Sequence, residues 1–266
     1  MSNMKIAICV KQVPDSWAEK KMVSGRLDRE SVDAVLNDLD EYAIEEALRI
    51  VEPLNEGKET PEHTITLISM GPDRASEAIR KGLSMGADSG ILISDPALQG
   101  SDAVSTAKVL AKTIAEGGFD LVFCGTESTD ARMSVIPAML SELLGWAQLT
   151  FAGSVKVDLA GNKVEIARMT ESGVESMSAN FPCVVSVIEK INEPRYPSFK
   201  GIMAAKKKPI ENKSLADVGI NASEIKAWSD VLDAQPRPPR EKGVKLEDAG
   251  DGGAKLADYL LEKRLV

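Results

Sequence analysis

The sequence predicts an α/β fold: a doubly wound, mostly parallel sheet with an added β-hairpin region and a C-terminal extension. Strand-like and helix-like segments alternate over the first 150 residues, which favours a parallel sheet covered by helices on both faces. After residue 150 the pattern changes to strands joined by tight turns, which is typical of hairpins. The chain has 266 residues, of which 43% are hydrophobic and 27% charged. This is ordinary globular composition.

The first 150 residues contain four predicted strands and four predicted helices. The strands are β-prone apolar runs that end at Pro, Gly or Asp: residues 5–13, 63–70, 90–94 and 119–124. The helices cover residues 39–51, 74–85 and 103–115, and a loop that Gly125 opens leads into the fourth, which ends near 144. Asp73 and Asp102 are the expected N-caps, while Gly86 and Gly117-Gly118 are the expected stops.

The remaining residues are predicted to form a hairpin region followed by an extension. Residues 151–157 and 163–168 are predicted strands around a turn at 159–162, and residues 183–188 form another β run. An irregular loop is expected at 192–208. Beyond it we expect a helix within 215–232, a proline-rich linker at 236–240 and an amphipathic helix at 254–265.

Charge and composition exclude several function classes. The formal net charge is −9, whereas nucleic-acid binding normally shows as a basic face. No run of 18 apolar residues exists to insert into a membrane, and the start of the chain lacks the pattern of a secretory signal. Three scattered cysteines indicate buried thiols in a reducing compartment, so a cytoplasmic location is expected.

The sequence contains no evident catalytic or metal-binding constellation. His63 is the single histidine and is expected on a surface loop. The cysteines do not pair at CxxC spacing, and neither GxxxxGK[ST] nor GxGxxG occurs. We therefore expect no metal and a protein that binds, docks or carries.

The ends of three predicted strands indicate a nucleotide site. Ligands of doubly wound sheets lie beyond the carboxyl ends of the strands, here Cys9-Val10-Lys11, Met70-Gly71 and Cys124-Gly125. The segment Gly125–Asp130 then leads toward a helix, whose free N–H groups would suit a phosphate. The alternative is that Ser128, Thr129 and Asp130 are only helix-capping residues.

Two features of the 192–208 segment have alternative interpretations. Phe199 lies in a polar loop, where an aromatic residue is either tucked under its own loop or an anchor for a partner. The lysines at 206–208 are expected to form a solvated face rather than a site for acidic partners.

Several long motifs, in order, resemble the β subunits of electron-transfer flavoproteins. The resemblance covers about residues 4–210, and the tail is similar to that of the longer actinobacterial members. The motifs are CVKQVPD, EEAL, SMGPDRASEAIRKGLSMGADSG, DLVFCGTESTD, RMTESGVESMSANFPCVVS and INEPRYPSFKGIMAAKKK.

The resemblance implies an adenine-nucleotide-binding fold and an electron carrier that works as an αβ heterodimer. FAD would be held mainly by the α subunit, and a structural AMP by this chain. Electrons would arrive from acyl-CoA and other flavin dehydrogenases and leave to a quinone-linked oxidoreductase of the respiratory chain. One alternative is a subunit of an electron-bifurcating flavoprotein that carries a second FAD and uses NADH. Another is an ATP-binding module similar to stress proteins.

The resemblance also implies two sets of site residues. The nucleotide set is Cys9, Asn37, Asp38, Leu39, Asp40, Met70, Gly125, Thr126, Glu127, Ser128, Thr129, Asp130, Ala131, Arg132, Met133 and Ser134. The partner-recognition set is Asn192, Glu193, Pro194, Arg195, Tyr196 and Phe199, within a recognition loop at 192–203.

This chain departs from the family at the end of the phosphate loop. Residues 131–137 are bulkier than the polar residues and glycine of many members, which argues against a second FAD. Two interpretations of Arg132 stay open: it compensates by pairing with a phosphate, or it is simply a solvent-exposed arginine. The resemblance places the nucleotide-binding domain at 1–210 and an extension that wraps the α subunit at 211–266.

Overall fold

The computed structural model describes residues 3–23, 26–235, 238–240, 242–243 and 245–266. It divides into two compact units, Met1–Leu232 and Asp233–Val266. The larger unit is built on a nine-stranded sheet of order β11-β10-β9-β12-β8-β1-β6-β7-β13. Its bounds are β1 Lys5–Cys9, β6 Thr64–Met70, β7 Ser89–Ile93, β8 Leu121–Gly125, β9 Ala147–Asp158, β10 Lys163–Thr170, β11 Gly173–Asn180, β12 Cys183–Val187 and β13 Ile210–Lys213.

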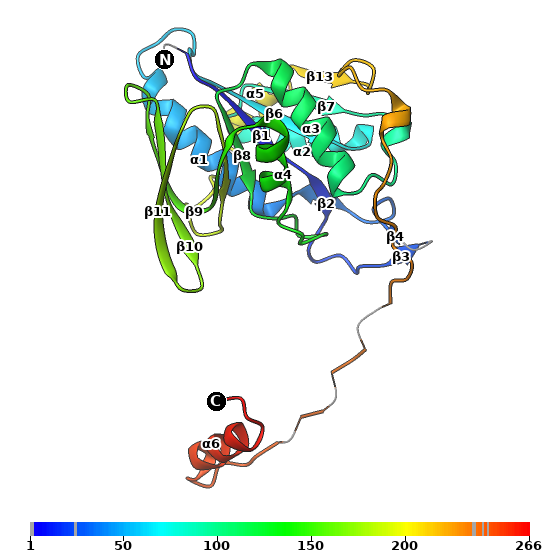
Figure 1. The fold of residues 1–266 in the computed structure, drawn as a ribbon, viewed down its shortest axis with the longest axis vertical. Helices are drawn as coiled ribbons and strands as arrows, with labels where there is room; N and C mark the ends of the chain where they lie inside the picture. The colour runs from blue at the N-terminus through cyan, green and yellow to red at the C-terminus, as the bar shows by residue number, and fades with distance from the viewer. Residues whose placement is uncertain (1–2, 24–25, 236–237, 241, 244) are drawn as a thin grey trace. The chain divides into compact units, whose positions relative to one another are not determined.

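Helices cover both faces of this sheet (Figure 1). One apolar core joins it to α1, α2 and α5, and the other joins it to α3 and α4. Their bounds are α1 Asp38–Asn55, α2 Ser76–Met85, α3 Ala103–Gly117, α4 Ile136–Leu144 and α5 Phe199–Ala205. The doubly wound α/β prediction is therefore confirmed.

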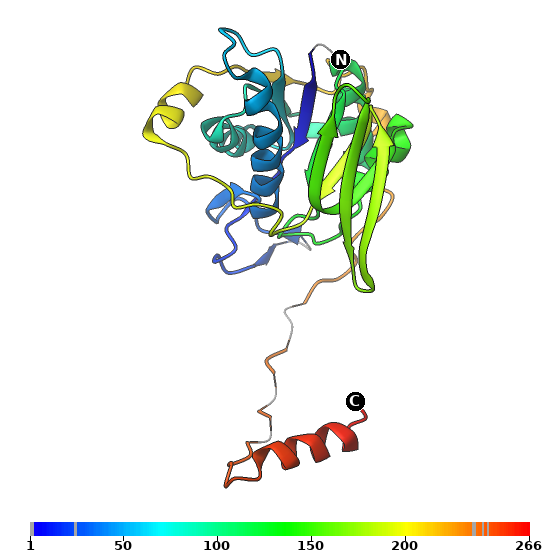
Figure 2. The ribbon, with the colours of Figure 1, turned by 90° about the vertical axis from the view of Figure 1, so that its left-hand side faces the viewer.

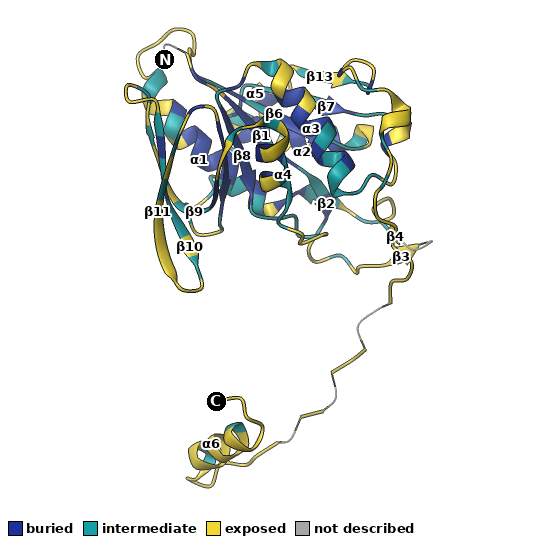
Figure 3. Cartoon of the chain, in the orientation of Figure 1, coloured by how far each residue is buried: buried dark blue, intermediate teal, exposed yellow. Residues whose placement is uncertain are grey.

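The centre of the sheet is parallel because its strands are buried on both faces. All five residues of β8 and of β12 are buried, and β1 pairs in parallel with both β6 and β8. Such strands appear in the sequence as continuous Val, Leu, Ile and Phe runs without alternation. Figure 3 shows the burial concentrated in these strands and in the helix faces against them.

The hairpin region extends one end of the sheet as an antiparallel ribbon (Figure 2). It has three strands rather than the two predicted, because β11 pairs with β10 along its whole length. Strand β11 was missed because its residues, GVESMSAN, are mostly exposed and carry no apolar alternation. At the opposite end of the sheet, β13 is a further unpredicted strand, paired in parallel with β7.

Short elements complete the larger unit. Two small antiparallel pairs lie between β1 and α1, and three 3₁₀ turns follow later in the chain. They are β2 Gln12–Pro14 with β5 Ala34–Leu36, β3 Met22–Val23 with β4 Arg26–Leu27, and the turns Asp73–Ala75, Pro96–Leu98 and Ala222–Glu224. The prediction of a helix within 215–232 is wrong, because turns and one 3₁₀ turn occupy this segment.

Of the helix ends predicted from the sequence, Asp102, Gly86 and Gly118 are confirmed, whereas the N-cap role of Asp73 is wrong. Asp102 caps α3 by accepting a hydrogen bond from Ser105 N at 2.9 Å, and Gly118 ends that helix at a φ of 64°. Gly86 ends α2, as expected, with a positive φ of 148°. Asp73 is not a side-chain cap of α2, because its carboxylate instead accepts from Ser94 Oγ at 2.7 Å.

Two polar residues expected at the surface are built into the fold. His63 is buried, and its Nδ1 accepts a hydrogen bond from Met4 N at 3.1 Å. Lys208 donates to the carbonyls of Leu83, Gly86 and Ala87, at the C-terminus of α2. The solvated-face interpretation is therefore wrong for the third lysine of the run, since its ammonium takes up carbonyl groups that a helix end leaves free.

The boundary expected at residue 210 lies inside the larger unit, because β13 belongs to the sheet and the unit continues to Leu232. The smaller unit contains one helix, α6 Gly252–Glu262. Leu256, Leu261 and Leu265 of this unit are exposed. The linker predicted at 236–240 includes residues 236–237, which lie outside the described part of the chain. No helix in the described ranges is long and apolar enough to cross a bilayer.

Candidate functional site

A cleft with a volume of about 970 Å³ lies beyond the carboxyl ends of the central strands. Four segments that are distant in sequence form most of its lining: residues 14–20 with Leu27, the first turn of α1, the loop after β8, and the segment after β12. Lys81 of α2 and Phe151 of β9 complete it. The described lining residues are Pro14, Ser16, Lys20, Leu27, Asp38, Leu39, Glu41, Tyr42, Lys81, Thr126, Glu127, Thr129, Asp130, Arg132, Ser134, Phe151, Ile188, Glu189, Lys190, Pro194, Arg195 and Tyr196. The cleft thus brings together parts of both predicted sets of site residues.

Asn37 holds the loop that follows β8. Its side-chain amide donates to the Glu127 carbonyl at 2.9 Å, and its Oδ1 accepts from Thr129 N at 3.0 Å. The same amide also donates to Asp40 Oδ1 at 2.9 Å. Asn37 is buried and does not line the cleft, so in this structure it positions the loop.

Asp40 explains why residue 125 is a glycine. Its buried carboxylate accepts from the backbone N–H of Lys11 and from the side-chain amide of Asn37. A Cβ on Gly125 would lie 2.7 Å from Asp40 Oδ1 and 2.8 Å from the Leu39 backbone. Burial raises the pKa of Asp40 to about 7, against the effect of these donors. The glycine therefore allows the close approach of α1 to β8.

Asp130 is the centre of an ion-pair network under the cleft. Its side chain is 1% exposed and pairs with Lys11 Nζ at 2.9 Å and with the Arg29 guanidinium. Although burial opposes the effect, Lys11, Ser128 and Arg29 lower the pKa of Asp130 to about 2. Asp130 is thus an ionised carboxylate that anchors the loop to the segment between β1 and β2 and to the β4–β5 connection.

The end of this loop presents unpaired backbone N–H groups. Arg132 and Ser134 have φ values of 49° and 55°, and both side chains pair with the Glu127 carboxylate. In the part of the chain that the structure describes, no acceptor is bonded to the N–H groups of residues 133–136. Helix α4 begins only at Ile136, so residues 126–135 form a loop and not the start of the helix. Consecutive free N–H groups before a helix are suited to an anion.

The cleft has a balanced charge rather than a basic one. Its described lining residues contain five basic and five acidic side chains: Lys20, Lys81, Arg132, Lys190 and Arg195 against Asp38, Glu41, Glu127, Asp130 and Glu189. The cleft therefore does not act as a general trap for anions, and any phosphate must be bound by local N–H groups.

The remaining predicted nucleotide residues lie beside or beneath the cleft. Cys9, Asp40, Met70, Gly125, Ser128, Ala131 and Met133 are not among the lining residues. Cys9 and Met70 are at the ends of β1 and β6 and pack against the α3–α4 core, whereas Met133 and Ala131 are exposed. Cys9 and Met70 therefore lie at the strand ends but do not line the cleft in this structure.

The recognition loop is held by acidic residues of α1. Arg195 donates from Nε to Glu45 Oε2 at 2.7 Å and from Nη1 to Glu52 Oε1 at 2.5 Å. These ion pairs raise the pKa of Arg195 further above its usual range. Asn192 is buried and donates to the Tyr42 carbonyl and to Glu46 Oε2, both at 3.0 Å. We call the Arg195–Glu45–Glu52 group the Arg195 clamp.

Beyond this clamp the loop exposes an apolar patch. Tyr196 is 94% exposed, Phe199 80%, Ile202 45% and Met203 47%. Phe199, Ile202 and Met203 share one face of α5, since residues three and four apart are neighbours on a helix. Ser198 caps this short helix by accepting from Gly201 N. Phe199 is therefore not tucked under its own loop.

Sequence reasoning missed several residues that shape the site. Glu45 and Glu46 are buried acids inside the EEAL motif, and Lys11 and Arg29 hold Asp130. Phe151, whose φ is 60°, lines the cleft. The adjacent acids in the EEAL motif were the sequence feature that could have predicted the clamp. The contacts of Lys11, Arg29 and Phe151 could not be predicted in this way, because they join segments that are distant in sequence.

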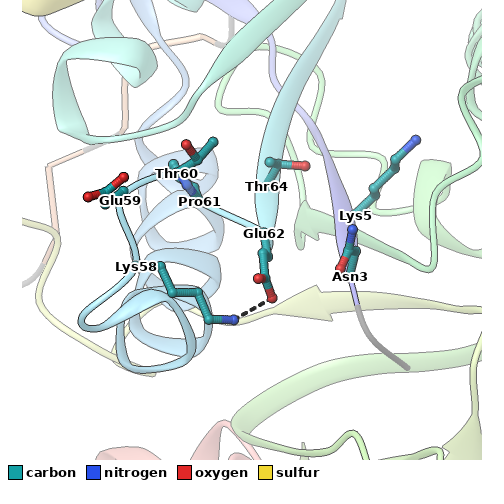
Figure 4. A pocket seen from close by; sticks show the side chains of 8 residues that line it. All are labelled: Asn3, Lys5, Lys58, Glu59, Thr60, Pro61, Glu62 and Thr64. Atoms are coloured by element: carbon teal, nitrogen blue, oxygen red, sulfur yellow. Dashed lines mark hydrogen bonds and ion pairs between the residues drawn. The ribbon is translucent and has the colours of Figure 1, made fainter.

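A second, smaller pocket lies at the opposite edge of the sheet (Figure 4). It has a volume of about 580 Å³. It lies at the amino ends of the central strands β1 and β6, whereas the first cleft lies beyond the carboxyl ends of the strands. Lys58 and Glu62 pair across it at 2.6 Å. It contains no predicted site residue.

Comparison with known proteins identifies the family. The electron transfer flavoprotein domain matches residues 24–218. The chain is 44% identical over 267 residues to the electron transfer flavoprotein subunit beta of Mycobacterium leprae, covering 98% of this chain and 99% of that protein. It is 35% identical to the protein of the same name from Megasphaera elsdenii, covering 98% and 97%, and 36% identical to that of Bradyrhizobium diazoefficiens, covering 95% and 97%. The chain belongs to the electron transfer flavoprotein family, among its β subunits.

Proposed function

We propose that this chain is the β subunit of a heterodimeric electron carrier. An α subunit would hold most of the FAD, accept electrons from acyl-CoA and other flavin dehydrogenases, and deliver them to a quinone-linked oxidoreductase. A cytoplasmic location is part of this proposal. Family membership supports the electron-transfer role, and the exposed apolar patch around Phe199 is the structural observation that favours docking.

The proposed dehydrogenase contact is the recognition loop at 192–203. A docking loop needs an apolar anchor that is accessible and a support that fixes its direction. Phe199 is accessible, and the Arg195 clamp together with Asn192 ties the start of the loop to α1. Glu193 and Pro194 connect the two hydrogen-bonded residues and have no contact that assigns them a separate role. A fixed support with one exposed anchor suits specific but short-lived complexes.

AMP is the nucleotide that we propose for the loop after β8. The free N–H groups of residues 133–136 and the guanidinium of Arg132 are donors that fit a phosphate. Cys9 and Met70, at the strand ends, would face the adenine. When bound, AMP would tie the loop to the sheet and supply no chemistry. Gly125 itself has no room for a ligand atom, because Asp40 and Leu39 occupy that space.

The electron-carrier proposal is tested by Phe199→Ala in the co-expressed αβ complex. Loss of a central apolar anchor costs about 2 kcal/mol or more, so reduction by the cognate dehydrogenase should slow at least about tenfold at low carrier concentration. Reduction by dithionite should be unchanged. Trp228→Ala is the matched control, since Trp228 is 72% exposed but lies outside the loop. Equal rates for Phe199→Ala and wild type would contradict the docking role.

The nucleotide content of the same complex separates the AMP proposal from its alternative. One flavin and one AMP per heterodimer are expected. Two flavins would instead indicate the bifurcating subunit, which uses NADH. ATP bound to the chain without an α subunit would indicate the stress-protein-like module. Arg132→Gln should lower the AMP retained after gel filtration, whereas Lys190→Gln, on the far wall of the cleft, should not.

The C-terminal residues are proposed to contact the α subunit. Helix α6 exposes Leu256 and Leu261, and Tyr259 is 40% exposed. An apolar helix surface of this kind is stabilised by burial against a partner. Deleting residues 236–266 should lower the melting temperature of the heterodimer; equal melting temperatures with and without the tail would contradict this contact.

A further inference from the structure

Two cysteines are neighbours at the carboxyl end of the central sheet. Cys9 ends β1, Cys124 lies in β8, and the two residues are partners in the register of this parallel pair. Neighbouring strands are about 4.8 Å apart, which is within the range of Cα separations that a disulfide spans, roughly 4.4–6.8 Å. In-register residues of parallel strands project from the same face of the sheet. The spacing of the two strands therefore places the Cα atoms of the pair within the range that a disulfide spans.

The side chains of the pair share one environment. Both pack in the α3–α4 core. Interaction with the Cys9 thiol, and then burial, raises the pKa of Cys124 well above its usual value, which is consistent with the strand register that makes the two residues neighbours. Cys9 is partly exposed, whereas Cys124 is buried. One thiol is thus accessible to a small oxidant, and the other is held beside it.

We infer that Cys9 and Cys124 form a reversible disulfide site that responds to hydroperoxides or to small disulfides. With hydrogen peroxide, the Cys9 sulfur attacks the O–O bond, which gives a sulfenic acid and water. The Cys124 sulfur then attacks the sulfenic sulfur, an S–S bond forms, and the hydroxyl leaves with the thiol proton as a second water. Two thiols are oxidised and one peroxide is reduced. A dithiol reductant reverses the step by exchange.

The cross-link would act on the candidate site, because it joins two segments that lead into it. Lys11 follows Cys9 by two residues and holds Asp130, while Gly125 follows Cys124 and opens the loop. Fixing the ends of β1 and β8 to each other removes freedom between these segments.

Cys183 provides an internal control. It is buried in β12 and is in register with Leu121, not with a cysteine. Burial raises the pKa of its thiol to about 12. The chain has three cysteines, so native oxidation at the proposed site leaves one free thiol.

The test is a thiol count on the intact, natively folded protein in its purified complex. Reduced protein is treated with hydrogen peroxide or diamide, quenched with acid, unfolded and labelled with N-ethylmaleimide. We expect the mass of this chain to show one label, on Cys183, with a Cys9–Cys124 peptide that disappears after dithiothreitol. Cys183→Ser should give the same linked peptide and no label. Cys124→Ser should lose the linked peptide and leave Cys9 labelled or oxidised.

Two outcomes would overturn the inference. Three labels on the oxidised wild-type chain would show that no disulfide forms in the folded protein. A linked peptide that contains Cys183, or one that forms only when urea is present during oxidation, would show that the native register does not select the pair. Both readouts use the wild-type chain and do not depend on the folding of a variant.

Discussion

The Arg195 clamp makes a quantitative prediction about how the recognition loop is held. Arg195→Met keeps an unbranched apolar side chain of about the length of arginine's aliphatic part but removes the guanidinium. Glu45, whose side chain is only 8% exposed, then loses its ion pair and keeps only the backbone N–H of residue 195 as a donor. Breaking a fully buried ion pair in this way costs about 3–5 kcal/mol. Because the Arg195 side chain is 34% exposed, solvent screens the pair, and we expect a smaller loss of about 2 kcal/mol.

Glu52→Gln is the matched control for this variant. Glu52 pairs with the same guanidinium, but its side chain is 51% exposed. Its loss should therefore cost about 0–1 kcal/mol. A loss of about 2 kcal/mol lowers the melting temperature of a domain of this size by roughly 4–8 °C, whereas Glu52→Gln should shift it by less than about 4 °C.

The assay is unfolding of the purified protein by heat and by urea at one fixed protein concentration. The fixed concentration matters because binding to a partner raises the apparent stability. If Arg195→Met and Glu52→Gln have the same unfolding free energy, the buried arm of the clamp contributes nothing and our assignment of Glu45 is refuted. A change in the urea m-value would instead show that the substitution altered how compact the unfolded or the native state is.

Three further predictions concern single polar groups whose contacts are built into the fold. Lys208→Met should lower the free energy of unfolding by about 1–3 kcal/mol, because three backbone carbonyls lose their hydrogen-bond donor. Lys206→Met is the control and should have little effect. Urea unfolding of both variants measures the difference. Burial lowers the pKa of His63, so the unfolded state binds more protons and stability is lost as pH falls below about 6.5. The free energy of unfolding should therefore fall more between about pH 7 and 5 for wild type than for His63→Asn, and parallel profiles would contradict this. Asn37→Ala should free the loop at 126–134 for faster limited proteolysis; an unchanged cleavage rate would show that Asn37 does not hold it.

Local chemistry in the sequence determined the fold class and most of the central elements. Continuous apolar runs predict buried parallel strands, and amphipathic runs with Asp102 or Gly118 at their ends predict the helices. These signals are local, since they depend on periodicity and caps within a few residues. Strands β11 and β13 carried no such signal. The first is mostly exposed and packs only Met177 and Ala179 against the core, and the second is four residues, IENK, that pair because β7 presents an open edge.

The family motifs predicted which residues belong to the candidate site, but not how these residues are arranged in space. The family motifs identified the loop after β8 and the recognition loop. Only the tertiary structure decided that Asn37 and Asp40 hold the first from beneath, and that Glu45 and Glu52 hold the second. These contacts join residues about 90 to 150 positions apart, and no local pattern encodes which partner a side chain reaches.

Tertiary structure also decided the roles of polar residues that looked ordinary in the sequence. His63 and Lys208 were expected in solvent, yet one accepts a backbone N–H in the core and the other takes up the free carbonyls at the end of α2. Gly125 was expected to open a phosphate-binding loop, and the structure shows that its missing Cβ makes room for α1. The sequence by itself determined which residues are polar, small or apolar. Burial and the identity of the distant partner, which only the folded chain specifies, decided what each of them does.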